Sequence, residues 1–125
     1  MNLLADGAGI YTLSWQPGTR IVENYVFDIV RSLWAGDFPI SGIYLDDRSS
    51  LITVTNNILE NVPVGIDFHQ AEYNTVVNNM ASYQERDASR NDFIQEGDFD
   101  VEAIRANAGI DRAYATTVPT TPVQP

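Results

Sequence analysis

Short segments of the chain alternate apolar and polar residues, and each begins with the same Gly-Ile pair. Three such segments place inward-facing residues two positions apart, namely Ile10 and Thr12, Ile43 and Leu45, and Ile66 and Phe68. This period is typical of a strand with one buried face. Segments 52–54 and 75–77 are rich in β-branched residues and predict a second strand. A third short strand is expected around 25–29 and 58–62.

The strand pattern recurs along the chain as an internal repeat. GIYLDDRSSLITVTNNILENVPV is followed by GIDFHQAEYNTVVNNM, and Asn57 and Asn79 lie 22 residues apart. A weaker copy runs from Gly9 to Asn24. Repeats of this length indicate stacked supersecondary units, and the turns between these strands are too short for crossover helices. The sequence therefore predicts an all-β chain folded as a parallel β-solenoid.

Stacked coils would place equivalent side chains above one another, about 4.8 Å apart. Asn24, Asn57 and Asn79 would then form one column, in which each amide donates to the carbonyl of its neighbour. The interpretation is a structural asparagine ladder at a bend between strands. The alternative is a row of asparagines that binds a ligand.

The first coil carries about ten extra residues, 31–40, which must bulge from the stack. Trp34 lies in this insertion, and Trp15 lies in the turn after the first strand. Such aromatic side chains either form a wall of a sugar cleft or close over a core.

The C-terminal part departs from the repeat. We expect the coils to occupy residues 1–98, with a partial fourth coil or a loop packed against the side over 82–96. A capping helix and turn are predicted over 99–115, and the proline-rich residues 116–125 are predicted to be a flexible tail.

Capping residues support the helix. Asp100 suits the N-cap and Gly109 suits the left-handed position after the C-terminus. Val101, Ile104 and Ala108 share one face, which would let the helix cover the last coil.

The two quoted copies resemble the right-handed parallel β-helix repeats of pectate-lyase-like polysaccharide lyases and glycoside hydrolases. The closing DFDVEAIRANAGIDRAY is similar to the C-terminal helix and turn of the same proteins. The resemblance covers about residues 9–114 and implies a right-handed parallel β-helix of about three to four coils, equivalent to a C-terminal piece of such an enzyme. It also places a family acidic group at Asp46 and a family histidine at His69, although Gln70-Ala71 replaces the Tyr-Gly that follows the histidine in relatives.

Strand alternation predicts one outward strip with candidate chemistry. Residues two and four positions after each glycine would face outward, and stacking would place Asp46 beside His69 and Tyr44 beside Asp67. Asp46, Asp67 and His69 are the candidate catalytic residues. The candidate ligand-binding residues are Tyr11, Tyr44, Asp47, Trp15 and Trp34.

Three chemistries fit these residues. Asp46 and His69 could act as an acid/base pair. An inverting glycosidase would need two carboxylates about 6.5–9.5 Å apart, for which Asp46 or Asp47 with Asp67 would serve. A lyase would add a Ca²⁺ ion on these aspartates, and no other cofactor or metal is predicted. The chain has one histidine and no cysteine, which argues against a structural zinc site.

Charge limits the partners. The chain has 7 basic and 17 acidic residues, a net charge of −10, which would repel nucleic acids and anionic membranes. The N-terminus lacks the pattern of a signal peptide, and no apolar run is long enough for a membrane span.

An uncapped terminal coil exposes strand edges. The coil over 9–29 has little sequence ahead of it, so we expect self-association through this coil as a two-fold homodimer. The functional hypothesis is a non-catalytic module that self-associates and binds a glycan on its outward face. The alternative is a polysaccharide lyase or glycoside hydrolase that uses the aspartate and histidine strip.

Overall fold

The computed structural model describes residues 6–81, 83–84 and 90–109, which form mostly strands in parallel sheets with one short helix. The strands are β1 (Gly7–Thr12), β2 (Arg20–Val22), β3 (Tyr25–Phe27), β4 (Ile40–Leu45), β5 (Thr53–Thr55), β6 (Ile58–Glu60), β7 (Val64–Phe68), β8 (Thr75–Val77), β9 (Tyr83–Gln84) and β10 (Asp92–Ile94). The helix is α1 (Val101–Asn107).

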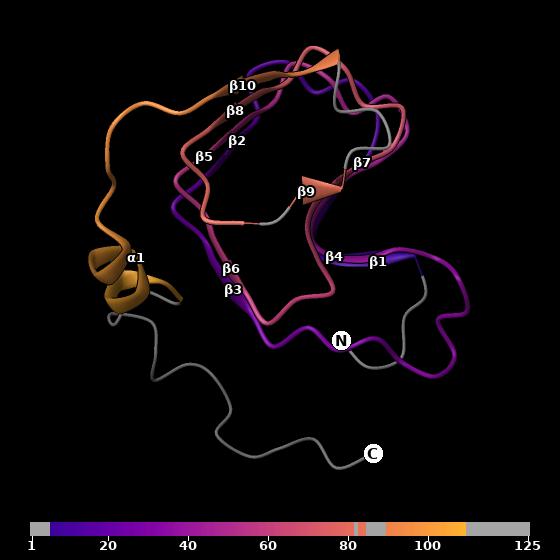
Figure 1. The fold of residues 1–125 in the computed structure, drawn as a ribbon. Coiled ribbons are helices and arrows are strands. Elements are labelled where there is room, and N and C mark those ends of the chain that lie inside the picture. Colours follow the sequence, from indigo (N-terminus) through magenta and orange to yellow (C-terminus); the bar gives the residue numbers. More distant parts are fainter. Residues whose placement is uncertain (1–5, 82, 85–89, 110–125) are drawn as a thin grey trace, which may run out of the picture.

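The strands form three sheets that the chain visits in turn. The first sheet has the order β1-β4-β7-β9, the second β10-β8-β5-β2, and the third β3-β6. Figure 1 shows equivalent strands of successive rounds lying over one another. The strands predicted from alternation are confirmed. Between residues 82 and 96, β9 and β10 extend the first and second sheets, as a partial further round would.

Equivalent residues of successive rounds are in register, and their side chains make the core. Ile10 pairs with Ile43, and Ile43 pairs with Ile66. Burying one such side chain contributes about 1.5–3 kcal/mol. The fully or almost fully buried members of this cluster are Ile21, Ile43, Leu45, Ile52, Val54, Leu59, Ile66, Phe68, Ala71 and Val76.

The glycine of the Gly-Ile pair is required by a close approach between sheets. A Cβ atom on Gly42 would lie 2.2 Å from Leu59 Cδ2 and 3.0 Å from the carbonyl oxygen of Gly65. Gly9 is similarly crowded, with Val26 Cγ1 at 2.7 Å from such an atom. The repeated glycine therefore makes room for a core residue of the third sheet.

The predicted asparagine column is confirmed. Asn24 Nδ2 donates to Asn57 Oδ1 at 2.9 Å, and Asn57 Nδ2 donates to Asn79 Oδ1 at 2.8 Å. The residue before each of these asparagines has a positive φ, of 54° at Glu23, 54° at Asn56 and 48° at Asn78. Asparagine tolerates this left-handed conformation well, which explains the Asn-Asn pairs at the bends.

A second asparagine pair lies at the other end of the second sheet. Asn74 Nδ2 donates to Asn91 Oδ1 at 2.8 Å, and the Ile52 backbone N–H donates to Asn74 Oδ1 at 3.0 Å. These asparagines immediately precede β8 and β10, so they satisfy buried backbone groups where the chain enters the second sheet. This pair was not predicted from the sequence.

Most of the predicted insertion over 31–40 lies in the loop between β3 and β4, residues 28–39, and Ile40 is the first residue of β4. The Arg31 guanidinium donates to the carbonyl oxygens of Gly36 at 2.8 Å and Phe38 at 2.6 Å, which fixes the loop. Ala35 is buried in a small cluster with Ile29 and Ile40. The loop thus covers a core through aliphatic residues, whereas Trp34 is 83% exposed.

The helix has the predicted cap but a different position. Asp100 Oδ1 accepts from the Ala103 N–H at 2.9 Å, and Gly109 has φ of 109°. The Arg105 guanidinium binds the Glu60 carboxylate of β6, and α1 lies outside the outline of the stacked strands in Figure 1. The helix therefore lies at the side of the stacked strands (Figure 1), and not over the last coil as expected, with Ile104 buried and Arg105 paired with Glu60.

Residues 110–115 of the predicted helix and turn and the predicted tail over 116–125 lie outside the described residues. Within the part that the structure describes, no helix combines the length and apolar character needed to cross a membrane.

Candidate functional site

Asp46 and His69 follow directly after β4 and β7, at equivalent positions of two successive rounds. The Asp46 N–H donates to the Thr12 carbonyl oxygen at 3.1 Å, and the His69 N–H donates to that of Leu45 at 3.0 Å. These bonds continue the ladder of the first sheet beyond its strands. They bring Asp46 Oδ1 to 2.8 Å from His69 Nδ1, so the predicted contact between these side chains is confirmed.

The Asp46 carboxylate is 10% exposed and accepts several hydrogen bonds. The donors are the Tyr11 hydroxyl, the Tyr44 hydroxyl, the Asp47 backbone N–H and His69 Nδ1. Burial raises the pKa of Asp46, but these donors outweigh burial and hold the pKa below its usual range. Asp46 is therefore ionised at neutral pH.

The pKa of Tyr11 shifts in the opposite direction to that of Asp46. Burial and the hydrogen bond to Asp46, together with the negative charges of Asp46, Asp6 and Asp47, raise the pKa of Tyr11 to about 12. The phenol therefore stays protonated at neutral pH and donates to the carboxylate. This bond positions the Asp46 side chain against His69.

The arrangement leaves one nitrogen of His69 available for chemistry. An ionised carboxylate can only accept, so His69 Nδ1 carries the proton in the bond to Asp46. In the neutral ring, Nε2 then has a lone pair, and the His69 side chain is 39% exposed. Gln70 Nε2 lies 3.5 Å from this nitrogen. The pair can accept a proton from a bound molecule or return one to it.

Two predicted members of the outward strip are not accessible. Tyr44 is 2% exposed and Asp67 is fully buried, although the two are register partners as expected. The edge of Tyr11 packs against Tyr44, with ring centroids 5.3 Å apart at 88°. The expectation that Tyr44 offers a sugar platform and Asp67 a catalytic carboxylate is wrong, because alternation gives the direction of a side chain and not what covers it.

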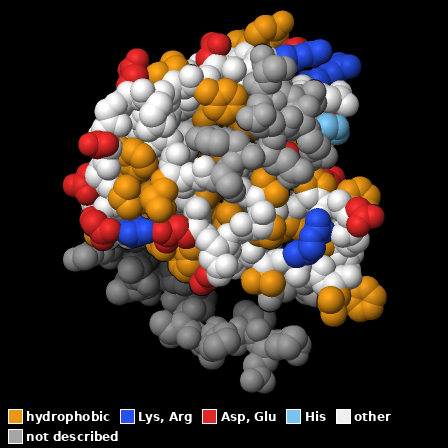
Figure 2. All heavy atoms as spheres, viewed as in Figure 1, with side chains coloured by type: hydrophobic (Ala, Val, Ile, Leu, Met, Phe, Trp, Pro, Cys, Tyr) orange, Lys and Arg blue, Asp and Glu red, His pale blue; other side chains and the backbone are white. Residues whose placement is uncertain are grey.

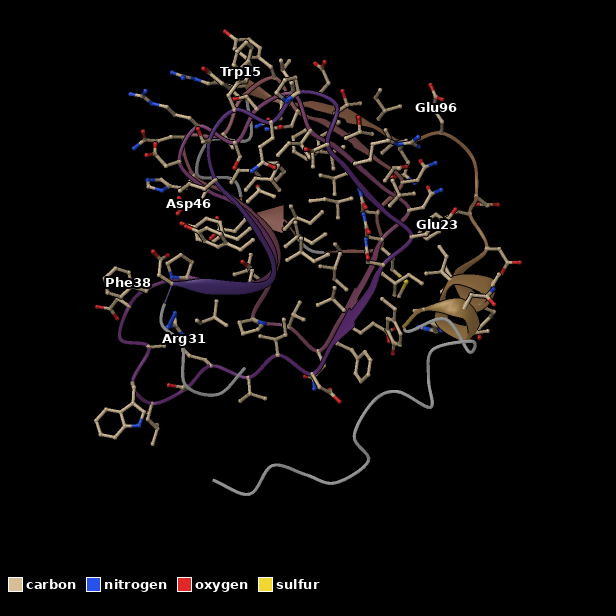
Figure 3. All side chains as sticks on the ribbon, turned by 180° about the vertical axis from the view of Figure 1, so that it is seen from behind. Trp15, Glu23, Arg31, Phe38, Asp46 and Glu96 are labelled. Carbon is tan, nitrogen blue, oxygen red and sulfur yellow. The ribbon has the colours of Figure 1, made fainter. Side chains whose placement is uncertain are left out.

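The remaining candidates are exposed but do not form one group. Asp47 is exposed beside Asp46, and Trp15 is 69% exposed after β1. Trp34 lies on the β3–β4 loop. Figure 3 shows Phe38 of the same loop on the other side of Asp46 from Trp15. Trp15 is thus separated from the loop that carries Trp34.

A groove of about 650 Å³ lies next to His69, where the chain turns from the first sheet to the second. Figure 2 shows basic side chains gathered near the only histidine. Among the lining residues, only Trp15 was a candidate predicted from the sequence. The lining residues are Trp15, Arg48, Ser50, Gln70, Glu72, Tyr73 and Arg90.

Within the described ranges, no group of three or more histidine, cysteine, aspartate or glutamate side chains is arranged to hold a metal ion. Asp46, Asp47 and Asp67 therefore do not form the Ca²⁺ site considered for a lyase. In comparisons with known proteins, no family model, curated protein or solved structure matches the chain.

Proposed function

We propose that the chain is a right-handed parallel β-helix module that binds carbohydrate on the outward side of its first sheet. The order in which the chain visits three parallel sheets supports the fold, as do the asparagine contacts at equivalent bends. The observation that carries the binding proposal is the pair of exposed aromatic side chains near Asp46 and His69. Tyr11 is 43% exposed and Trp15 is 69% exposed. Aromatic faces beside a few fixed polar groups are typical of ligand sites.

Calorimetric titration with neutral and acidic oligosaccharides tests this proposal. We expect saturable binding, and a loss of about tenfold or more in affinity in Trp15→Ala because a stacking surface is removed. Trp34→Ala is the matched control, since Trp34 is also exposed but lies on the β3–β4 loop. Unchanged affinity in Trp15→Ala, or no binding across the panel, would contradict the proposal.

The second candidate is a polysaccharide lyase or glycoside hydrolase. The 2.8 Å contact between Asp46 and His69 favours it, because an aspartate that orients a histidine is a common acid/base arrangement. We expect product release, measured as reducing ends or unsaturated sugars, to fall at least about 100-fold in His69→Ala and in Asp46→Asn. Binding should persist in His69→Ala. Activity that survives both substitutions would exclude this pair as the catalytic group.

We also propose that two copies associate through the first round. β1, β2 and β3 each lie at an edge of their sheet in the described part of the chain, and unpaired edges are templates for further pairing. A closed two-fold dimer would cover them. Light scattering over a dilution series should show a dimer, and Ile10→Lys should weaken it while circular dichroism shows that the fold is kept. A monomer throughout the micromolar range would contradict this proposal.

A further inference from the structure

The groove next to His69 crosses successive rounds of the chain. Trp15, Ser50 and Glu72 are connected by parallel bridges, so they occupy equivalent positions at the turn between the first and second sheets. Two strand spacings, about 9.6 Å in all, therefore separate the backbone at Trp15 from that at Glu72. Tyr73 is the next residue and also lines the groove. The groove thus has one aromatic side chain at each end of this interval.

The two aromatic side chains are exposed, whereas the residue between them is small and buried. Trp15 is 69% exposed and Tyr73 is 66% exposed, while Ser50 is only 5% exposed. The Ser50 hydroxyl donates to the carbonyl oxygen of Arg48 at 2.9 Å, which fixes it at the floor of the groove. Two exposed aromatic faces with a low point between them suit a ligand that has two apolar projections.

The C-terminal sequence has prolines at a fixed spacing that fits this interval. Pro119, Pro122 and Pro125 lie three residues apart in the uncharged segment TTVPTTPVQP. A polyproline II helix has three residues per turn and rises about 3.1 Å per residue, so these prolines would share one face at intervals of about 9.3 Å. This interval matches the separation of the two aromatic positions. Grooves with exposed aromatic side chains are the usual sites for proline-rich segments in this conformation.

The groove also supplies donors for the backbone of such a segment. A polyproline II helix makes no internal hydrogen bonds, so its carbonyl oxygens need donors from outside. The exposed Arg48 guanidinium lines the groove, and Trp15 carries an indole N–H. Arg31 shows the same chemistry elsewhere in the chain, because its guanidinium donates to the carbonyl oxygens of Gly36 and Phe38.

The proline-rich segment can reach the groove of its own chain. The end of α1 lies near the other end of the second sheet, because Ala108 lines one small cleft together with Asn56. The six residues from Ser50 to Asn56, which include β5, span at most about 20 Å. The ten residues from Gly109, the last described residue, to Pro119 span up to about 33 Å when extended. The connection is therefore long enough.

We propose that the proline-rich segment 116–125 of this chain binds in the groove as a polyproline II helix. Two of its prolines pack against Trp15 and Tyr73, and Arg48 donates to its carbonyl oxygens. Trp15 also belongs to the proposed carbohydrate surface, so the bound segment covers part of that surface. This inference goes beyond the proposed function and does not depend on it, because its test contains no sugar.

The middle proline is the position to change, because Pro122 belongs to both pairs of prolines at the required spacing. Acrylamide quenching of Trp15 fluorescence reports on the groove of the intact chain once Trp34→Phe leaves a single tryptophan. We expect Pro122→Ala to raise the quenching constant about twofold or more, because the ring loses its cover when the segment dissociates. Thr121→Ala, the matched control, should leave it unchanged. Equal quenching in the two variants would overturn the inference.

Calorimetric titration with a synthetic peptide of residues 116–125 gives a second measurement. The full chain carrying Pro122→Ala should bind this peptide at least about tenfold more tightly than the parent chain, in which the attached segment competes at a high effective concentration. In the Pro122→Ala chain, adding Trp15→Ala should lower the affinity about tenfold or more, whereas adding Trp34→Ala should not. No binding of the peptide, or equal affinity for the parent and Pro122→Ala chains, would overturn the inference.

Discussion

Asn57 connects three rounds of the chain through one buried side chain. Its Oδ1 accepts from the backbone N–H and Nδ2 of Asn24, and its Nδ2 donates to the carbonyl oxygen of Ile21 at 3.0 Å and to Asn79. We expect Asn57→Ala to lower the free energy of unfolding by about 3 kcal/mol or more, since several buried groups lose their partner at once. Urea unfolding measures this change.

Asn24→Ala is the control for that substitution. Asn24 is the first member of the column and is only half-buried, so water can replace some of the hydrogen bonds that its amide makes. Its loss should cost clearly less than the loss of Asn57. Equal effects of the two substitutions would show that the additional buried contacts of Asn57 contribute nothing to stability.

The phenol of Tyr11 should lose its proton at a higher pH than an ordinary tyrosine. Its pKa is raised from 10.0 to about 12, so the protonated phenol contributes to stability below pH 10, and this contribution is lost as the pH rises toward 12. Ultraviolet absorbance during alkaline titration should show a phenol that ionises near pH 12 and is missing in Tyr11→Phe.

Asp46→Asn separates the causes of that shift. Burial is the largest cause, so the substitution should return the pKa of Tyr11 only part of the way toward 10.0. Tyr25, whose pKa is raised first by its hydrogen bond to Glu60, should be unaffected. A Tyr11 pKa that does not move in Asp46→Asn would show that the carboxylate does not hold the phenol.

The sequence predicted single residues well where the repeat is regular. Asn57 and Asn79 end two clear copies, and their contact follows from stacking. Asn74 and Asn91 lie 17 residues apart, outside the 22-residue spacing, and Ile52 takes the equivalent place one round earlier. Their pairing could not be predicted because it depends on where the last, shortened round enters the second sheet.

Among the elements, the first sheet depends on a glycine at each close approach. Gly42→Ala should lower the free energy of unfolding by about 1–3 kcal/mol, because the new methyl group would overlap Leu59. In a double-mutant cycle with Leu59→Ala, the double variant should lose less free energy of unfolding than the sum of the losses in the two single variants. Additive losses, measured by denaturant unfolding, would show that the methyl group is accommodated without contact.

The helix α1 should open independently of the sheets. Its seven residues are too few for a stable isolated helix, so it depends on Ile104 and on the ion pair of Arg105 with Glu60. We expect Arg105→Ala to increase hydrogen exchange of the α1 amides while the amides of β4 and β5 keep their protection. Faster exchange throughout the protein would instead show that the helix supports the whole fold.

The strands could be predicted because alternation is a local signal, and the position of the helix could not. Its cap lies within Asp100–Ala103, but its site is selected by a contact between Arg105 and Glu60, 45 residues apart. Tyr25 completes this contact by donating to Glu60 at 2.8 Å. None of these residues carries the repeat pattern.

For the whole molecule, the net charge of −10 is the main electrostatic feature. Repulsion among surface carboxylates opposes the compact state, and salt screens it. We therefore expect the melting temperature to rise when the ionic strength increases from about 0.01 M to about 0.15 M. Sodium chloride and potassium chloride should act alike. A fall in the melting temperature would mean that attractive ion pairs such as Arg90–Glu72 outweigh the repulsion.

The groove could not be predicted because it exists only when three rounds are stacked. Trp15, Ser50 and Glu72 come from separate parts of the sequence, and Tyr73 has no aromatic equivalent at Gly18 or Leu51. The contact of Asp46 with His69 was accessible from the sequence because both follow the same strand of two copies.

The two connections between the third and first sheets differ in length. Residues 61–63 suffice between β6 and β7, whereas residues 28–39 lie between β3 and β4, and the strands that follow are nevertheless in register from Ser41 with Val64 onward. The length of the loop between the third and first sheets therefore does not affect how the following strands pair. The corner is a natural acceptor for grafted peptides in protein engineering, and natural variants of the module could acquire new recognition loops there without rebuilding the scaffold.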